Sequence, residues 1–322
     1  MFTFDVRGVK LEHTPFWLDA HRKTPFSFVS HGHSDHLKNH DSILATPPTV
    51  LFHAMRAKQK KAIPLEFGQE WELDKAVIRL YPAGHILGSA MIRVEYNGSS
   101  LLYTGDFKIR ENETCEPIEI PRADILIMES TFGRPEYVNP HSRETLVGEI
   151  KDFIDTCLAN SITPVVMGYS LGKAQEAMKI IGDMGYNVKV HFSAWRFSKV
   201  YYDYGVRFRN CAPWYEKQVA PGEVLIIPPH LMMSRRIKNM PSRYRSVFLS
   251  GWANSENGMK FNSHHSIALS DHADFQELLD FIKTVNPSQV YTTHGDKDFP
   301  QYIREIGYDA RYLEPTKTVL SS

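Results

Sequence analysis

The sequence predicts a layered α/β fold into which a second α/β unit is inserted. Over residues 1 to about 130, short apolar runs alternate with Gly, Pro and Asn, as in strands that are joined by turns. At Thr163 a new strand, helix and strand pattern begins. From Ile267 onward, strands again run directly into polar residues, so we expect this tail to rejoin the first domain. The expected domains are residues 1–140 with 262–322 and, inserted between them, residues 141–261.

The expected elements follow the apolar runs and the helical spacing of apolar residues. In the first part, strands are expected at Phe2–Val9, Phe26–Val29, Ala76–Tyr81, Ala90–Tyr96, Ser100–Tyr103 and Ile125–Met128, and helices at His36–Asn39, Leu51–Lys61 and Glu144–Leu158. In the inserted unit, strands are expected at Pro164–Met167, Val188–Phe192, Val224–Ile227 and Ser246–Ser250, with a helix at Lys173–Met184. In the tail, strands are expected at Ile267–Leu269 and Val290–Thr293, with a helix from Ser270 through Lys283 between them.

The amino-acid composition limits which cellular compartment and which binding partners are expected. Lys and Arg number 37, as do Asp and Glu, so the net charge of zero does not indicate a polyanionic partner and any contact with nucleic acid must be local. Three scattered cysteines, Cys115, Cys157 and Cys211, argue against a disulfide framework or a thiolate zinc site and favour the cytoplasm. No apolar run reaches the about 18 residues that a membrane span needs, so we expect no membrane partner. The fifteen histidines, several of them clustered with carboxylates, indicate a metal site.

The strongest single signal is the segment from Phe28 to His36, in which an expected strand runs into a loop with four possible metal ligands. His31 and His33 alternate and can point the same way, while Asp35 and His36, at the expected start of a helix, can face a second ion. A histidine-rich turn can also lie idle in solvent. The added Asp-His pair favours metal binding over that alternative.

Three further candidate ligands each follow an expected strand: His85, Asp106 and His294. Singly, each could be a hydrogen-bonded buried histidine or a turn residue. Jointly, they supply what a two-metal site requires, namely a carboxylate that bridges and imidazoles that cap each ion. Neighbouring glycines would let the backbone approach the ions.

The order of these residues, with Asp19 ahead of them, resembles the metallo-β-lactamase superfamily. The resemblance implies an αββα sandwich with two divalent ions per chain, and the nitrogen and oxygen ligands suit zinc, with manganese or iron as alternatives. It further implies that Asp19 braces the histidine loop. One ion would be held by His31, His33, His85 and Asp106, and the other by Asp35, His36, Asp106 and His294.

Further motifs resemble those of the β-CASP nucleases, a branch of that superfamily with an inserted α/β cap domain. Glu129, at the end of an expected apolar strand, resembles motif A, the segment around His272 resembles motif B, and the segment around His294 resembles motif C. The turn at residues 168–175, GYSLGKAQ, resembles the one that opens the cap-domain helix. Within this branch the sequence looks most similar to the DNA-ligase-associated exonucleases and the messenger-RNA 3′-end-processing-factor-like exonucleases.

This resemblance implies a metal-dependent hydrolase that cuts phosphodiester bonds of DNA or RNA, as an exonuclease in nucleic-acid processing or repair. The catalytic residues would be Asp106, His272 and Glu129. Asp106 would bridge the ions, and His272, oriented by Glu129, would supply the proton for the leaving oxygen.

The nucleic acid, expected to be single-stranded, would be gripped by basic residues of the cap. Lys173 stands where larger relatives usually carry an arginine, and the best basic run, residues 234–245, contains Arg235 and Arg236. The segment from Trp195 to Tyr215 adds aromatic side chains suited to stacking. The alternative interpretation is a solvated basic face beside an ordinary aromatic core.

Two other functional classes remain open at this point. A small-molecule esterase or lactonase, or a cyclic-nucleotide phosphodiesterase, could use the same metal core, but Glu129, His272 and the cap would then have no special task. A metal-poor binding subunit is disfavoured because every expected ligand position is filled. The sequence does not distinguish DNA from RNA, exonuclease from endonuclease action, or a homodimer from assembly with processing proteins.

Overall fold

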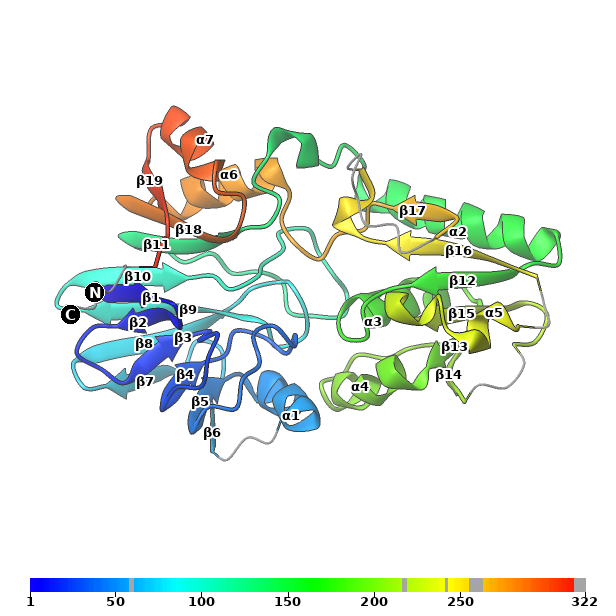
Figure 1. Cartoon of the computed structure of the whole chain (residues 1–322), viewed down its shortest axis with the longest axis horizontal. Coiled ribbons are helices and arrows are strands. Elements are labelled where there is room, and N and C mark those ends of the chain that lie inside the picture. Colours follow the sequence, from blue (N-terminus) through cyan, green and yellow to red (C-terminus); the bar gives the residue numbers. More distant parts are fainter. Residues whose placement is uncertain (58–60, 216–218, 241–242, 255–262, 316–322) are drawn as a thin grey trace, which may run out of the picture. The chain divides into compact units, whose positions relative to one another are not determined.

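The structure is a computed structural model that describes residues 1–57, 61–215, 219–240, 243–254 and 263–315; the side chain of Arg236 lies outside the described part. The chain folds into two compact units (Figure 1). Unit 1 comprises Met1–Glu111, Cys115–Pro135 and His272–Ser322, and unit 2 comprises Asn112–Thr114 and Glu136–Asp271. Among the described residues, no helix combines the length and the apolar character that spanning a membrane requires.

The described residues of unit 1 form two mixed sheets and three α-helices. The first sheet has the strand order β1 (Phe2–Asp5), β2 (Gly8–Leu11), β3 (Phe16–Leu18), β4 (Phe26–Phe28), β5 (Ser42–Ala45) and β6 (Ala62–Pro64). The second has the order β19 (Asp309–Tyr312), β18 (Gln289–Gly295), β11 (Ile125–Ser130), β10 (Ser99–Tyr103), β9 (Ala90–Tyr96), β8 (Ala76–Pro82) and β7 (Glu70–Leu73). The helices are α1 (Pro47–Arg56), α6 (Phe275–Val285) and α7 (Phe299–Glu305).

The central strands of the second sheet are apolar on both faces because both faces are covered. In β10, Leu101 and Tyr103 pack into a core shared with the first sheet, while Leu102 between them packs into a core with α6 and α7. This alternation follows from the two-residue period of a strand. On the outer face of the first sheet, Ile43 packs with residues next to α1. The layers are therefore helix, sheet, sheet and helix, and the expected αββα sandwich is confirmed.

Unit 2 is a six-stranded sheet in which every strand pair is parallel. Its strand order is β14 (Cys211–Trp214), β13 (Asn187–His191), β15 (Glu223–Ile227), β12 (Thr163–Met167), β16 (Tyr244–Leu249) and β17 (His265–Ile267). Its helices are α2 (Arg143–Ala159), α3 (Lys173–Asp183), α4 (Phe192–Asp203) and α5 (Arg235–Lys238), with 3₁₀ turns η1 (Pro135–Tyr137), η2 (Pro229–Leu231) and η3 (Gly251–Asn254). Because the strands are parallel, their carboxyl ends meet at one edge, where each following helix begins.

Most expected elements are confirmed within a few residues. Strand β9 has the expected bounds, and α2 extends one residue beyond its expectation at each end. Helix α1 begins at Pro47 instead of Leu51 because Thr46 caps its first turn, accepting a hydrogen bond from the Thr49 amide. Helix α6 begins at Phe275 instead of Ser270 because Asp274 forms a reciprocal cap with Glu277.

Three expectations were wrong. No helix forms at His36–Asn39, where residues 34–36 make a turn, because strand β5 follows too closely to repay the cost of starting a helix. The expected strand Phe2–Val9 is two strands, since the Asp5 carboxylate accepts a hydrogen bond from the Arg7 amide (2.7 Å) and stabilises a tight turn between them. The segment Phe192–Asp203, for which no helix was expected, forms α4.

Candidate metal centre

The expected ligands of unit 1 lie at one end of its sheets. Strands β8 and β10 both run antiparallel to β9, and β10, β11 and β18 are mutually parallel, so β8, β10, β11 and β18 end at the same edge. His85 and Asp106 follow β8 and β10, while Glu129 and His294 lie near the ends of β11 and β18. The loop with His31 follows β4 of the first sheet.

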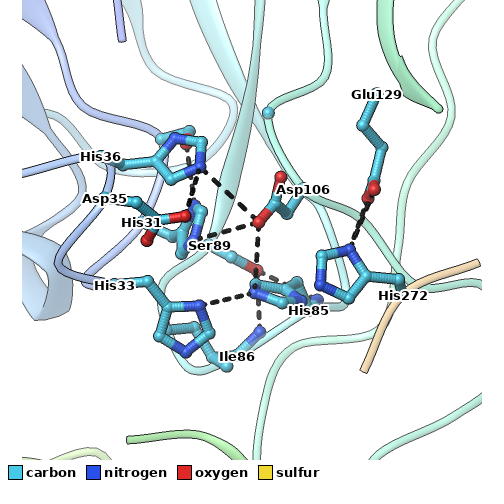
Figure 2. Close-up of polar contacts among 12 residues, drawn as sticks. His31, His33, Asp35, His36, His85, Ile86, Ser89, Asp106, Glu129 and His272 are labelled. Carbon is cyan, nitrogen blue, oxygen red and sulfur yellow. Dashed lines mark hydrogen bonds and ion pairs between the residues drawn. The ribbon is translucent and has the colours of Figure 1, made fainter. Parts of the chain in front are cut away.

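Four side chains form a tight cluster at this edge: His31, His33, His85 and Asp106 each offer one ligand atom within 4.8 Å of the others (Figure 2). The Nε2 atom of His85 lies 3.1 Å from Nδ1 of His33 and 3.9 Å from Oδ2 of Asp106. Nε2 of His31 lies 3.5 Å from the same carboxylate oxygen. Ligands 2.0–2.1 Å from a tetrahedral zinc ion are about 3.3 Å apart, so these spacings suit a divalent ion.

A hydrogen bond to Ser30 orients His31 so that its ligand atom points into the cluster. Ser30 Oγ lies 2.9 Å from Nδ1 of His31, which turns Nε2 toward Asp106. That Nε2 atom is buried and has no hydrogen-bond partner among the described residues. A buried imidazole nitrogen without a partner is costly in an empty apolar setting but suits a metal ligand.

Asp19 connects the loop that carries His31 and His36 to strand β10 of the second sheet. Its buried carboxylate accepts hydrogen bonds from the amide of Ser30 (2.8 Å), from Nδ1 of His36 (3.0 Å) and from the hydroxyl of Tyr103 (3.1 Å). Asp19 adopts a left-handed backbone conformation with φ of 43°. Such strain persists only where the surrounding contacts determine it, and here it turns the chain so that one carboxylate reaches all three donors.

Two glycines precede ligands at points of close backbone approach. Gly105 has φ of 56°, and a Cβ atom there would lie 2.6 Å from Cβ and Oγ of Ser30. Gly84 has φ of 71°, and its Cβ would lie 2.3 Å from the carbonyl oxygen of Lys108. Both therefore require glycine, and the close approach is to neighbouring protein atoms.

Among the residues expected to hold a second ion, His36 lies as close to Asp106 as the first cluster does, whereas His294 lies farther from His36. Nε2 of His36 lies 3.6 Å from Oδ2 of Asp106 and 3.7 Å from Oδ2 of Asp35, whose side chain is 75% exposed. The ring of His294 lies 5.6 Å from that of His36, centroid to centroid. The second position therefore has His36 at ligand spacing from Asp106 and from Asp35, but its ligand atoms do not form a group as compact as the first cluster among the described residues.

A cavity of 430 Å³ opens beside this second position. Its lining includes Asp35, His36, His294, His21 and Lys297. The His21 ring lies 5.1 Å from that of His294. Sequence reasoning missed His21 and Lys297, although each lies within three residues of an expected site residue, Asp19 or His294.

Glu129 and His272 form a separate pair close to Asp106. Nδ1 of His272 lies 2.9 and 3.0 Å from the two carboxylate oxygens of Glu129. A carboxylate only accepts, so Nδ1 carries the proton and Nε2 has the lone pair. Glu129 is fixed in turn by the amide of Phe107 (2.7 Å) and the hydroxyl of Thr131. Asp106, Glu129 and His272 also satisfy the spacing of a metal-binding group.

Burial and neighbouring charges shift the pKa values of the histidines in different directions. Burial lowers the pKa of His31 well below its ordinary value, with the neighbouring His36 adding to the decrease, and lowers the pKa of His294 to about 4. Burial has the same effect on His36, but the carboxylates of Asp106 and Asp19 outweigh it and raise the pKa to about 10. Burial raises the pKa of Asp106 to about 7 against the opposing effect of His36. His31 and His294 are therefore neutral near pH 7, as metal ligation requires.

The expected substrate-binding residues lie in unit 2, and their settings differ. Lys173 is 1% exposed, and its ammonium group lies 2.7 Å from the carboxylate of Glu176, which Arg143 also contacts at 2.8 Å. A phosphate contact through Lys173 would require this buried ion pair to open. Arg235, at the start of α5, is exposed, while the Arg236 side chain is outside the described residues.

An αββα sandwich with a histidine and aspartate cluster at one edge defines a metallo-hydrolase class of protein, and sequence comparisons agree. A family model described as the Zn-dependent metallo-hydrolase RNA specificity domain matches residues 259–313. A protein from Opitutus terrae named "Probable DNA ligase" is 39% identical to this sequence over 310 residues. The matched region is 94% of this chain and 30% of that protein.

More distant similarities point to the same family. The "Cleavage and polyadenylation specificity factor subunit 3-I" of Arabidopsis thaliana is 24% identical over 289 residues, which are 72% of this chain and 41% of that protein. The "RNase J-like protein" of Methanocaldococcus jannaschii is 34% identical over 122 residues, 37% of this chain and 29% of that protein. The chain spans less than half the length of each of these relatives. It belongs to the β-CASP branch of the metallo-β-lactamase superfamily, as its motifs predict.

Proposed function

We propose that this protein is a two-metal-dependent nuclease that hydrolyses phosphodiester bonds at the ends of nucleic-acid strands. The observation that carries the proposal is the convergence on Asp106 of two kinds of group. Imidazoles suited to metal ligation surround its carboxylate, and the His272–Glu129 pair lies close to it. A simple esterase or lactonase on the same core gives the second pair no task, which is why we favour phosphodiester cleavage.

The proposed ligands use both sides of Asp106. His31, His33, His85 and Asp106 would hold one ion, and Asp35, His36, Asp106 and His294 the other. The all nitrogen and oxygen donor set suits zinc, and manganese or iron fit the same ligands. Bound divalent ions would supply Lewis acidity, lowering the pKa of a water molecule and neutralising charge on phosphate oxygens. The cavity beside His294 and Lys297 leaves room for a phosphate next to the second position.

His272 would act as the general acid. Glu129 fixes its ring and keeps the proton on Nδ1, so Nε2 would take up a proton and deliver it to the leaving oxygen. The competing role, also compatible with the spacing of Asp106, Glu129 and His272, is metal ligation. Asp19 would act through the histidine loop as a positioning residue.

DNA is the substrate that we favour. The relative named a probable DNA ligase aligns with 94% of this chain, so a segment much like the whole chain accompanies DNA joining there. RNA is the second candidate, because residues 259–313 match an RNA specificity domain and several relatives are named ribonucleases. We further propose that unit 2 is the cap domain and that it binds the strand through Arg235, Arg236 and, once its buried ion pair opens, Lys173. We also propose that the protein acts in the cytoplasm, together with processing or ligation proteins or with a second copy of the chain.

The test is to incubate the zinc-loaded protein with end-labelled single- and double-stranded DNA and RNA, beside an ester and a lactone. Shortening of a labelled strand from one end is expected, with DNA cut fastest. His272→Ala should lower strand turnover by about 10²- to 10⁴-fold while zinc content stays the same. Zinc loss in that variant would make His272 a ligand. Hydrolysis of the ester or lactone without cleavage of any strand would refute the proposed function.

A further inference from the structure

The most exposed aromatic side chains among the described residues all lie in unit 2. Tyr215 is 63% exposed, Phe192 51%, Tyr169 45% and Tyr204 41%. A single exposed ring on a protein surface needs no explanation. Several rings on one part of a small sheet do, because each one leaves apolar surface in water.

The topology places three of these rings at one edge of the sheet. Tyr169 lies two residues after the end of β12, Phe192 directly follows β13, and Tyr215 directly follows β14. All strands are parallel, so these positions share the carboxyl edge. Tyr204 follows α4, which begins at that edge and runs back, so it lies toward the opposite edge. We call Tyr169, Phe192 and Tyr215 the aromatic edge.

Two of the three rings are direct neighbours. Strands β13 and β14 are neighbours, with His191 in register with Trp214, so the residues that follow are adjacent. The ring centroids of Phe192 and Tyr215 are 6.0 Å apart with an interplanar angle of 34°. Tyr169 follows β12, two strand spacings or about 10 Å from β13. The edge therefore offers flat apolar faces at more than one point along its length.

Exposed arginines accompany the aromatic edge. The described parts of the connections that follow β12, β14 and β15 contain no Asp or Glu, although the connection that follows β17 at the same edge contains Asp271. Glu216 and Lys217, which follow Tyr215 in the sequence, lie outside the described residues. Arg196, one helical turn after Phe192 in α4, is exposed, as is Arg235 at the start of α5, the helix that follows β15. Aromatic faces flanked by arginines are the combination with which proteins bind single strands, since bases stack on the rings and phosphates pair with the cations.

We propose that the aromatic edge is a stacking surface for the bases of single-stranded nucleic acid. This inference rests on the proposed function, which it deepens by naming the surface that grips the strand. Stacking needs only the flat face of a base, so binding here would tolerate any sequence and would disfavour a duplex, whose bases are already stacked. Each ring should contribute about 5- to 150-fold to affinity.

The test is the dissociation constant of a fluorescent 12-nucleotide DNA with phosphorothioate linkages, measured by anisotropy at several salt concentrations. Phe192→Ala, Tyr215→Ala and Tyr169→Ala should each weaken binding by at least about 5-fold without changing the salt dependence. An abasic strand of equal length has phosphates but no bases. It should bind the wild type more weakly than the normal strand and bind all variants alike.

Tyr204→Ala is the matched control, because Tyr204 is similarly exposed but lies away from the aromatic edge. Equal weakening by Tyr204→Ala, unchanged binding in all three edge variants, or equal loss on the abasic strand would overturn the inference. A lowered unfolding temperature with unchanged affinity would also overturn it, by assigning the rings to packing. Hydrolysis of a normal strand is measured separately. Cleavage with ring-independent binding refutes only this inference, and ring-dependent binding without cleavage refutes only the proposed function.

Discussion

The two sides of Asp106 are built differently. On one side, His31 and His85 are completely buried, and His31 and its loop are fixed by Ser30 and Asp19. On the other, the Asp35 side chain is 75% exposed and His294 borders an open cavity. A site whose ligands are already ordered binds an ion with little further loss of entropy. The fold therefore already clusters the four ligand atoms of the first position, whereas the second has His36 in place and would be completed by Asp35 and His294 as ion and substrate arrive.

The largest effect is expected from Asp106→Asn, because Asp106 belongs to both sides. The amide keeps the shape but loses the charge that would bridge two cations. We expect strand hydrolysis to fall by about 10³-fold or more, which corresponds to several kcal/mol of lost charge stabilisation. Turnover measured under zinc saturation, with circular dichroism to verify folding, checks this. Activity within a few-fold of the wild type would remove Asp106 from the centre.

A comparison of His85→Ala with His294→Ala should distinguish the zinc affinities of the two sides. Removing His85 opens the preformed cluster, so we expect loss of the more tightly bound ion. Removing His294 should cause loss of only the more weakly bound ion. Zinc content after dialysis against a graded chelator series, determined by mass spectrometry, reads this directly. If His294→Ala loses zinc at lower chelator concentration than His85→Ala, the assigned order of the two sides is reversed.

A smaller effect is expected one step away from the ligands, at Asp19. Asp19→Asn should weaken zinc binding by about 10- to 100-fold, as is typical when a group that orients metal ligands is changed. Tyr103→Phe removes only one of the three donors to that carboxylate and should have a weaker effect. Competition titrations with a zinc indicator measure both. Equal zinc affinities in the wild type and Asp19→Asn would show that the loop keeps its conformation without the Asp19 carboxylate.

The effect farthest from the reaction concerns the stability of the loop that carries Asp35 and His36. His40 closes this loop, with Nδ1 accepting a hydrogen bond from the Thr24 amide (3.2 Å), and burial lowers its pKa to about 4. The unfolded chain binds this proton near pH 6.5, so the stabilisation is complete above pH 6.5 and is lost as the pH falls toward 4. The loss amounts to at most about 3 kcal/mol.

Urea unfolding of the zinc-free protein between pH 7.5 and 4 measures this loss. His40→Gln should show a shallower fall in the free energy of unfolding than the wild type over that window, and the difference between the two isolates His40 from the carboxylates that titrate nearby. Parallel curves would mean that His40 does not contribute to the pH dependence.

The layers could be predicted from the sequence because their signals are local. The apolar run of β9 lies in a stretch of a few residues, and its expected bounds are the observed ones. The caps at Thr46 and Asp274 are local signals too, but they were overlooked, so the expected starts of α1 and α6 differ from the observed ones. Helix α4 was missed because two of its buried positions are Ala194 and Ser198, small residues that do not register as a hydrophobic stripe, while its aromatic residues suggest a strand.

The site was predictable where ligands cluster in the chain and follow strands, as His31, His85 and Asp106 do. It was not predictable where the setting depends on distant residues. Lys173 stands in a motif that suggests phosphate binding, but a carboxylate one helical turn on and Arg143, thirty residues earlier, enclose it in a buried ion pair. His21 reaches the His294 side only through the turn at Asp19.

The most direct test of the central claim is a zinc titration of the metal-free protein, with hydrolysis of a labelled DNA strand measured at each step. We predict uptake of two equivalents, the first with high affinity and little activity, and hydrolysis that rises with the second. Uptake of no zinc, or strand hydrolysis that proceeds equally well before any metal is added, would contradict a dinuclear centre around Asp106.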